Sequence, residues 1–169
     1  MKIYRADLHI HTLLSPCAEL SMSPANIIET ASRRNLDIIG ISDHNTTRQS
    51  SLVRKLAEIK GIFVLRGAEV TTREEVHCLA FFDENDTLER FQELLDGSLP
   101  DVPNNPLIFG DQIVVDENED IVYTEERLLA NAVALFPKYL AASFHIRFGS
   151  LNLSGGEQAV GFDASLVHF

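Results

Sequence analysis

The chain has 169 residues, of which 45% are hydrophobic, and this is enough to bury the core of a single domain. Its formal net charge of −11 argues against non-specific binding to duplex nucleic acid or to an acidic membrane surface, because both need a positive field. No apolar run is long enough to span a membrane, and two cysteines without a secretory signal predict a cytoplasmic protein without disulfides.

The first predicted element is a strand that ends in the segment Asp7-Leu8-His9-Ile10-His11. Alternate side chains of a strand share a face, so His9 and His11 should point the same way, with Asp7 beside them. Two imidazoles at this spacing can grip one metal ion, although two partly exposed histidines without any ligand would show the same pattern.

Helices and strands then alternate. Ser23 is a good N-cap and Pro24 suits the first position of a helix. An apolar run, typical of a buried parallel strand, ends at the polar sequence Ser42-Asp43-His44-Asn45. The alternation predicts an α/β fold with a parallel or mixed sheet. The expected elements are strand 3–10, helix 25–34, strand 36–41, helix 47–59, strand 62–70, strand 76–82 and helix 87–95.

The regular alternation breaks after residue 96. Residues 97–110 are rich in Pro, Asn and Asp, and residues 112–115 and 121–123 flank a polar turn like a hairpin. This hairpin insertion, at about 98–124, could serve as a lid over a site or as structural decoration. The remaining expected elements are helix 125–135, strand 139–146 and strand 162–169, within one domain that spans the chain.

Candidate ligands for metal ions lie at or just beyond the ends of the apolar runs, which would gather them at one rim of the sheet. Imidazole and carboxylate ligands together suit zinc, manganese or iron, and a carboxylate can bridge two ions where a neutral imidazole cannot. Glu69 is the candidate bridge, and Asp43 could bind metal or orient His44 or a neighbouring ligand. The candidate ligands are His9, His11, His44, Glu69, His77 and His145.

At this point the sequence resembles the polymerase and histidinol phosphatase (PHP) superfamily of metal-dependent phosphoesterases. The segments that carry the resemblance are, in chain order, Asp7-Leu8-His9-Ile10-His11-Thr12, Ile41-Ser42-Asp43-His44-Asn45, Gly67-Ala68-Glu69, His77-Cys78-Leu79 and Phe144-His145-Ile146. The resemblance implies a distorted seven-stranded, TIM-like β/α barrel with two or three divalent ions on its rim. By that likeness His9 and His11 hold the first ion, Glu69 bridges, His77 and His145 hold the second, and His44 holds the third.

The chain departs from the family pattern in two places. Where many relatives carry Asp or His soon after the paired histidines, this chain has Cys17 and Glu19, and either could act as a ligand. The family also closes its site with a late Asp-x-His, whereas here Asp163 and His168 are five residues apart and would face opposite sides of a strand. We therefore expect a barrel that is truncated or atypical after about residue 146. Its open edge would seek a partner chain, which could be a second copy.

The function implied by the resemblance is hydrolysis of a small phosphomonoester, or of a nucleotide or oligonucleotide phosphate, by a metal-activated water. His9, His11, Asp43, His44, Glu69, His77 and His145 would form the catalytic site, with zinc, manganese or iron bound and magnesium as a further candidate. Arg48 and Arg147 could grip a phosphate or carboxylate, or could be solvated surface charges. The alternatives are a catalytically impaired metal-binding domain that acts in an assembly, and an amidohydrolase-like metal hydrolase.

Overall fold

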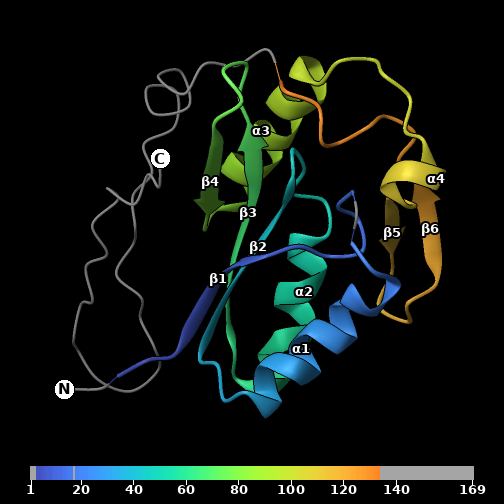
Figure 1. Cartoon of the computed structure of the whole chain (residues 1–169). Coiled ribbons are helices and arrows are strands. Elements are labelled where there is room, and N and C mark those ends of the chain that lie inside the picture. The colour runs from blue at the N-terminus through green and yellow to red at the C-terminus, as the bar shows by residue number, and fades with distance from the viewer. Residues whose placement is uncertain (1–2, 17, 134–169) are drawn as a thin grey trace.

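The centre of the molecule is a four-stranded sheet with the strand order β1-β2-β3-β4, seen in a computed structural model that describes residues 3–16 and 18–133 (Figure 1). Strands β1, β2 and β3 run parallel, and β4 runs antiparallel to β3. The strands are β1 (Ala6–Ile10), β2 (Ile38–His44), β3 (Phe63–Thr71) and β4 (His77–Phe82).

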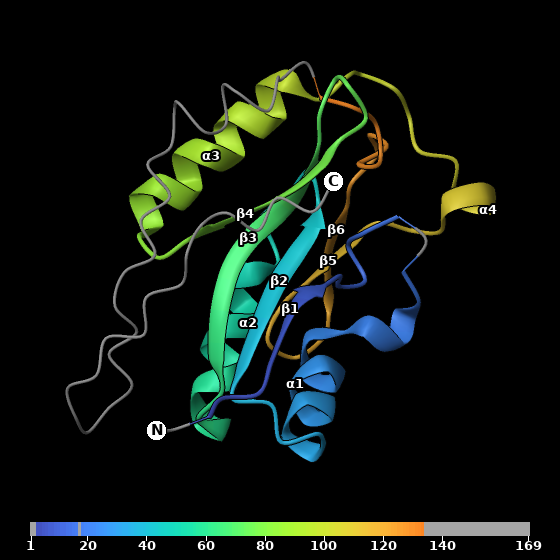
Figure 2. The ribbon, with the colours of Figure 1, turned by 60° about the vertical axis from the view of Figure 1, so that its left-hand side comes forward.

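Three helices of eight residues or more cover one face of this sheet (Figures 1 and 2). The helix predicted from the Ser23-Pro24 signal is confirmed, because the Ser23 hydroxyl accepts a hydrogen bond from the Asn26 backbone N–H at 3.5 Å. The helices are α1 (Pro24–Arg33), α2 (Ser50–Ala57) and α3 (Asn85–Ser98), with single 3₁₀ turns at η1 (Leu20–Met22) and η2 (Glu58–Lys60).

The core lies between the helices and this face of the sheet. Alternate side chains of the inner strands, such as Ile39, Ile41 and Val64, pack against α1 and α2. Farther along β3, Ala68 and Val70 pack against α3. The side chains at the other alternate positions of β2 and β3, which include His44 and Glu69, therefore face away from the helices.

The expected seven-stranded barrel is wrong for the residues that the structure describes. A β/α barrel needs a crossover connection between every pair of neighbouring strands, because its strands are all parallel. Here β3 turns directly into β4, and the tight turn is closed by the Thr72 N–H, which donates to the Val76 carbonyl at 2.9 Å. Within residues 3–16 and 18–133, the strands form an open mixed sheet and a separate two-stranded sheet.

The second sheet is the hairpin expected between residues 112 and 123. It follows the single-turn helix α4 (Pro106–Phe109) and pairs β5 (Ile113–Val115) with β6 (Ile121–Thr124) in antiparallel order. Ile113 and Val115 are buried, and the buried Gln49 amide holds both the N–H and the carbonyl of Val115. The hairpin is therefore anchored to the body of the domain.

The helix expected at 125–135 is wrong over residues 125–133, which contain only turns and an isolated bridge of Arg127 to Pro103. The backbone groups of this segment bind other parts of the molecule. The Gln112 side chain bonds to the backbone of Arg127 and Leu129, and the Val133 N–H donates to the Thr71 carbonyl. The expected strands 139–146 and 162–169 lie outside the described residues. None of the described helices is long and apolar enough to cross a membrane.

A candidate metal centre around Glu69

Glu69 lies at the centre of a cluster of four histidines. Its Oε2 atom is 3.0 Å from His9 Nε2, 3.1 Å from His11 Nε2 and 3.5 Å from His44 Nδ1. Its Oε1 atom is 2.9 Å from His77 Nδ1. The glutamate side chain is only 7% exposed, whereas those of His9 and His77 are about half exposed at 48% and 50%. The structure thus brings together five of the six ligands expected at the ends of the apolar runs, and the sixth, His145, lies outside the described residues.

The register of the sheet explains why these side chains meet. His44 and Glu69 are direct cross-strand partners at the ends of β2 and β3, so they share a face. His77 pairs with Thr71 at the start of β4, two residues beyond Glu69 and on the same face. The polar ends of three strands therefore converge by strand pairing alone.

The first strand reaches the cluster through an irregularity. Asp7 pairs with Ile39 and Ile10 pairs with Ile41, so three steps along β1 match two along β2. Because of this shift, the Ile10 side chain packs into the core between the helices and the sheet, whereas His9 and His11 lie on the face of the sheet that is turned away from the helices. The expectation that Asp7 shares their face is wrong, because the shift lies between them. Asp7 instead accepts a hydrogen bond from the His9 backbone N–H at 3.3 Å.

The electrostatics of the cluster favour the protonation states that bind metal. Burial alone would raise the pKa of Glu69, but its contacts with the side chains of His11, His9, His44 and His77 outweigh burial and lower the pKa well below its ordinary value. Burial, followed by the proximity of His11, lowers the pKa of His44 to about 4. At neutral pH the site therefore presents a carboxylate and, at His44, a neutral imidazole.

These donors fit a divalent ion. Two groups, His9 with His11 and Glu69, and His44 with Glu69 and His77, each offer three ligand atoms within 4.8 Å of one another. His44 Nδ1 is buried and has no hydrogen-bond partner, which is the arrangement expected of a nitrogen that coordinates a metal ion. Nitrogen and carboxylate donors in this mixture suit zinc, manganese or iron.

Behind the cluster, Asp43 holds the loop that follows β1. Its two carboxylate oxygens accept hydrogen bonds from the Thr12 N–H at 2.6 Å, the Thr12 hydroxyl at 2.8 Å and the Ser15 hydroxyl at 2.9 Å. Complete burial raises the pKa of Asp43, and these bonds and the nearby His11 offset part of that rise. The structure therefore places Asp43 behind the ligands. Sequence reasoning missed Thr12 and Ser15, and the one signal was their position directly after the paired histidines.

Two other predicted site residues lie apart from the cluster. Glu19 is exposed, and its carboxylate accepts the Ser21 hydroxyl at 3.1 Å. Among the described residues, it belongs to neither group of converging ligand atoms. The Arg48 guanidinium pairs with Asp96 of α3 at 2.6 Å, so its proposed contact with substrate stays a prediction. Cys17 and Arg147 lie outside the described residues.

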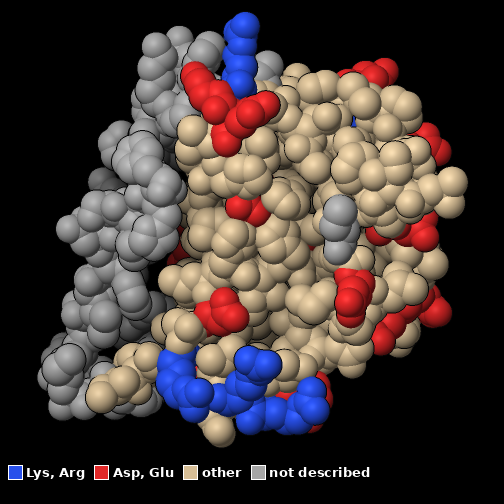
Figure 3. All heavy atoms as spheres, in the orientation of Figure 1, with Lys and Arg blue, Asp and Glu red and all other residues tan. Residues whose placement is uncertain are grey.

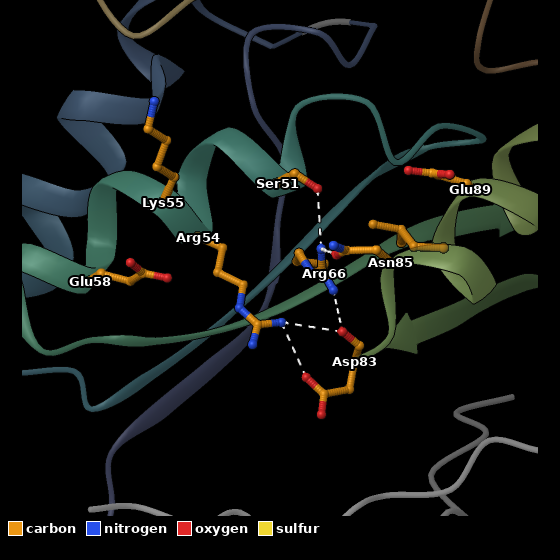
Figure 4. A pocket seen from close by; sticks show the side chains of 9 residues that line it. Ser51, Arg54, Lys55, Glu58, Arg66, Asp83, Asn85 and Glu89 are labelled. Atoms are coloured by element: carbon orange, nitrogen blue, oxygen red, sulfur yellow. Dashed lines mark hydrogen bonds and ion pairs between the residues drawn. The ribbon is translucent and has the colours of Figure 1, made fainter.

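A hollow of about 670 Å³ elsewhere on the molecule contains none of the candidate ligands (Figure 4). Its three cations, Arg54, Lys55 and Arg66, are matched by three acidic side chains, so its lining favours neither sign of charge. Arg66 bonds to the Asn85 side chain at 2.6 Å and to the carbonyl of Asp83, which fixes the start of α3 on the sheet. We interpret this hollow as structural.

Basic side chains gather away from the cluster on the face that Figure 3 shows. In that view most of the Lys and Arg side chains lie at the end of the sheet where β2 and β3 begin, and one basic side chain stands at the other end beside acidic ones. His44 and Glu69 lie near the ends of β2 and β3, away from the larger basic group. A positive field at the cluster would therefore come from bound ions more than from these basic side chains.

Comparisons with known proteins give partial likenesses. No model of a known protein family matches the chain. An uncharacterized protein of Methanocaldococcus jannaschii is 28% identical over 127 residues, which are 64% of this chain and 74% of that protein. A crystal structure of a proposed metal-dependent phosphoesterase from Bifidobacterium adolescentis is 29% identical, with a TM-score of 0.47 over 57% of this chain. That match spans only 34% of the phosphoesterase chain.

Proposed function

We propose that this chain is a metal-dependent hydrolase that acts on phosphoesters. The observation that carries the proposal is the convergence on Glu69 of four imidazoles from β1, β2 and β4 and the loop that follows β1. Burying several histidines around one carboxylate costs free energy unless every ring nitrogen finds a partner. Stability of the fold alone therefore does not explain the cluster. A cluster of this kind is typical of metal-dependent catalytic sites.

Two ions that share Glu69 match the donor groups best. His9 and His11 lie near one carboxylate oxygen, and His77 lies near the other, with His44 between them. A carboxylate can offer one oxygen to each of two ions, which an imidazole cannot. Zinc, manganese and iron suit this donor set, and magnesium suits it less because it prefers oxygen ligands.

When bound, such ions supply an activated water and neutralise charge on phosphate oxygens. The chain contributes ligand placement. Glu69 stays ionised and would hold the ions through its two oxygens, His44 is kept neutral by burial, and Asp43 holds the loop that carries Thr12 and Ser15. The choice of phosphoesters rests on the motif resemblance to the PHP superfamily, and the substrate we propose is a small phosphomonoester or a nucleotide or oligonucleotide phosphate. An amidohydrolase-like reaction would use the same metal chemistry.

The test begins with the metal content of the purified full chain and with its affinity for zinc and manganese. Phosphate release is then measured with p-nitrophenyl phosphate and with nucleotides. We expect His9→Ala and Glu69→Gln to lower the rate by roughly 100-fold or more, because even groups that only support metal ligands typically change activity by 10- to 100-fold. The matched control is Glu93→Gln, an exposed glutamate on α3, which should leave the rate unchanged.

Circular dichroism of each variant separates loss of activity from loss of fold. Full activity in both His9→Ala and Glu69→Gln would remove these residues from the mechanism. Bound metal without turnover under any supplied ion would replace the enzyme by a metal-binding domain that acts in an assembly.

A further inference from the structure

Ser15 occupies a buried position between Asp43 and two of the clustered histidines. It lies in the loop after β1 and is only 1% exposed. Its hydroxyl oxygen is 2.9 Å from Asp43 Oδ1, 3.0 Å from the His44 backbone nitrogen and 3.0 Å from His11 Nδ1. Three partners surround a group that has one hydrogen to donate and two lone pairs to accept with.

The donors and acceptors around Ser15 can be assigned by elimination. The His44 backbone N–H can only donate, so it uses one lone pair of the hydroxyl. Asp43 already accepts both the N–H and the hydroxyl of Thr12, and a carboxylate among such donors takes the Ser15 hydrogen as well. The second lone pair of Ser15 then faces His11 Nδ1, which must carry a hydrogen to complete the bond.

This assignment sets the state of the other nitrogen of His11. A neutral imidazole with its hydrogen on Nδ1 has a lone pair on Nε2. His11 Nε2 lies 3.1 Å from Glu69 Oε2 and 3.0 Å from His9 Nε2, at the centre of the cluster. A free histidine in water favours a hydrogen on Nε2, and so does the Glu69 carboxylate beside that nitrogen, so the loop has to impose the Nδ1–H tautomer.

We propose that Ser15 is a positioning residue that links Asp43 to His11, holds His11 in its Nδ1–H tautomer, and aims the Nε2 lone pair at a divalent cation. The part that concerns a cation rests on the proposed metal-dependent function. Ser15 itself touches no reacting atom, and its effect passes through the histidine ring. Asp43, which the sequence allowed either as a ligand or as an orienting group, orients a ligand through this serine.

The tautomer can be measured without metal. We propose two-bond ¹H–¹⁵N correlation spectra of the ¹⁵N-histidine-labelled, metal-free full chain, in which protonated and unprotonated ring nitrogens have different shifts. The His11 signals are assigned by their loss in His11→Gln. The wild-type chain should show His11 with its hydrogen on Nδ1. If Nε2 carries a hydrogen in the wild-type chain, alone or together with Nδ1, the inference is overturned without recourse to any variant.

Variants then separate positioning from a general structural role. Ser15→Ala should shift His11 toward the Nε2–H tautomer and weaken zinc or manganese binding by about 10- to 100-fold, the range typical for groups that orient metal ligands. Ser15→Thr keeps the hydroxyl and should restore the Nδ1–H tautomer. Ser32→Ala on α1 is the matched control and should change neither readout.

The two proposals can fail separately. A chain that binds no metal but holds His11 as Nδ1–H would overturn the proposed function and support the role of Ser15 in setting the tautomer. A chain that binds metal but keeps its tautomer and its affinity in Ser15→Ala would overturn the role of Ser15 alone.

Discussion

Asn45 stabilises the far side of the site from an uncommon backbone conformation. Its φ angle is 50°, in the left-handed region, and its side chain is buried directly after His44. The amide donates to the carbonyls of Leu129 and Asn131 at 2.6 and 2.8 Å and accepts the Thr71 N–H at 3.0 Å. A single side chain therefore joins the ends of β2 and β3 to the segment that follows β6.

We expect Asn45→Ala to lower the free energy of unfolding by about 2–4 kcal/mol, because buried backbone groups lose their partners and the left-handed conformation becomes strained. Asn35→Ala is the matched control, since Asn35 also has a positive φ, of 53°, but is exposed. It should cost only about 1 kcal/mol, for the backbone alone. Urea unfolding followed by circular dichroism measures both, and equal losses would mean that the buried contacts of Asn45 contribute nothing.

The individual ligands could be found in the sequence, whereas the groups that orient them could not. His44 and Glu69 stand at the ends of apolar runs, and strand pairing then brings them together. Ser15 acts through Asp43, which is distant in the sequence, and no local pattern reports that contact. Asp7 was misplaced because strict alternation in β1 fails where its register with β2 shifts.

Strands β3 and β4 approach each other closely at Gly67. A Cβ atom at this position would lie 2.7 Å from Phe81 Cδ1 and would overlap the carbonyl oxygen of Ala80. Gly97, near the end of α3, has nothing within 4 Å of such an atom. The same substitution therefore has opposite effects in the two elements.

Gly67→Ala should lower the free energy of unfolding by about 3 kcal/mol, because the added methyl group must displace backbone of β4. Gly97→Ala should raise it by about 0.5–1 kcal/mol, because alanine loses less conformational entropy in a helix. Chemical denaturation of the two variants beside the wild-type chain gives both values. A shift of the same sign in both would contradict the close approach of β3 and β4.

Helices and strands with local signals could be predicted, and those that depend on distant partners could not. The capping signal at Ser23 located α1, and the short helix expected at 87–95 is the middle of α3. Residues 125–133 have the composition of a helix, but the buried amides of Gln112 and Asn45 bind their backbone groups in another conformation. Tertiary contacts there override local propensity.

The α/β class and the mixed sheet follow from the alternation of patterns, whereas the barrel does not. The hairpin connection between β3 and β4 ends the parallel order, and the short apolar pattern of residues 76–82 does not show in which direction this strand pairs. The candidate site does not depend on closure among the described residues. Its side chains come from strands that already pair, together with the loop after β1.

Because the ligands come from separate strands, a bound ion would tie the strands together and should stabilise the fold. At a metal concentration 100 times its dissociation constant, binding adds about 2.7 kcal/mol, which corresponds to a rise in Tm of roughly 5–10 °C for a domain of this size. Differential scanning calorimetry with zinc or manganese should show this rise, and EDTA should reverse it. Glu69→Gln should abolish most of it, because both ligand groups share Glu69. Ions that bind only to the acidic surface of this chain, with its net charge of −11, would stabilise Glu69→Gln as much as the wild type. That result would place metal binding outside the cluster.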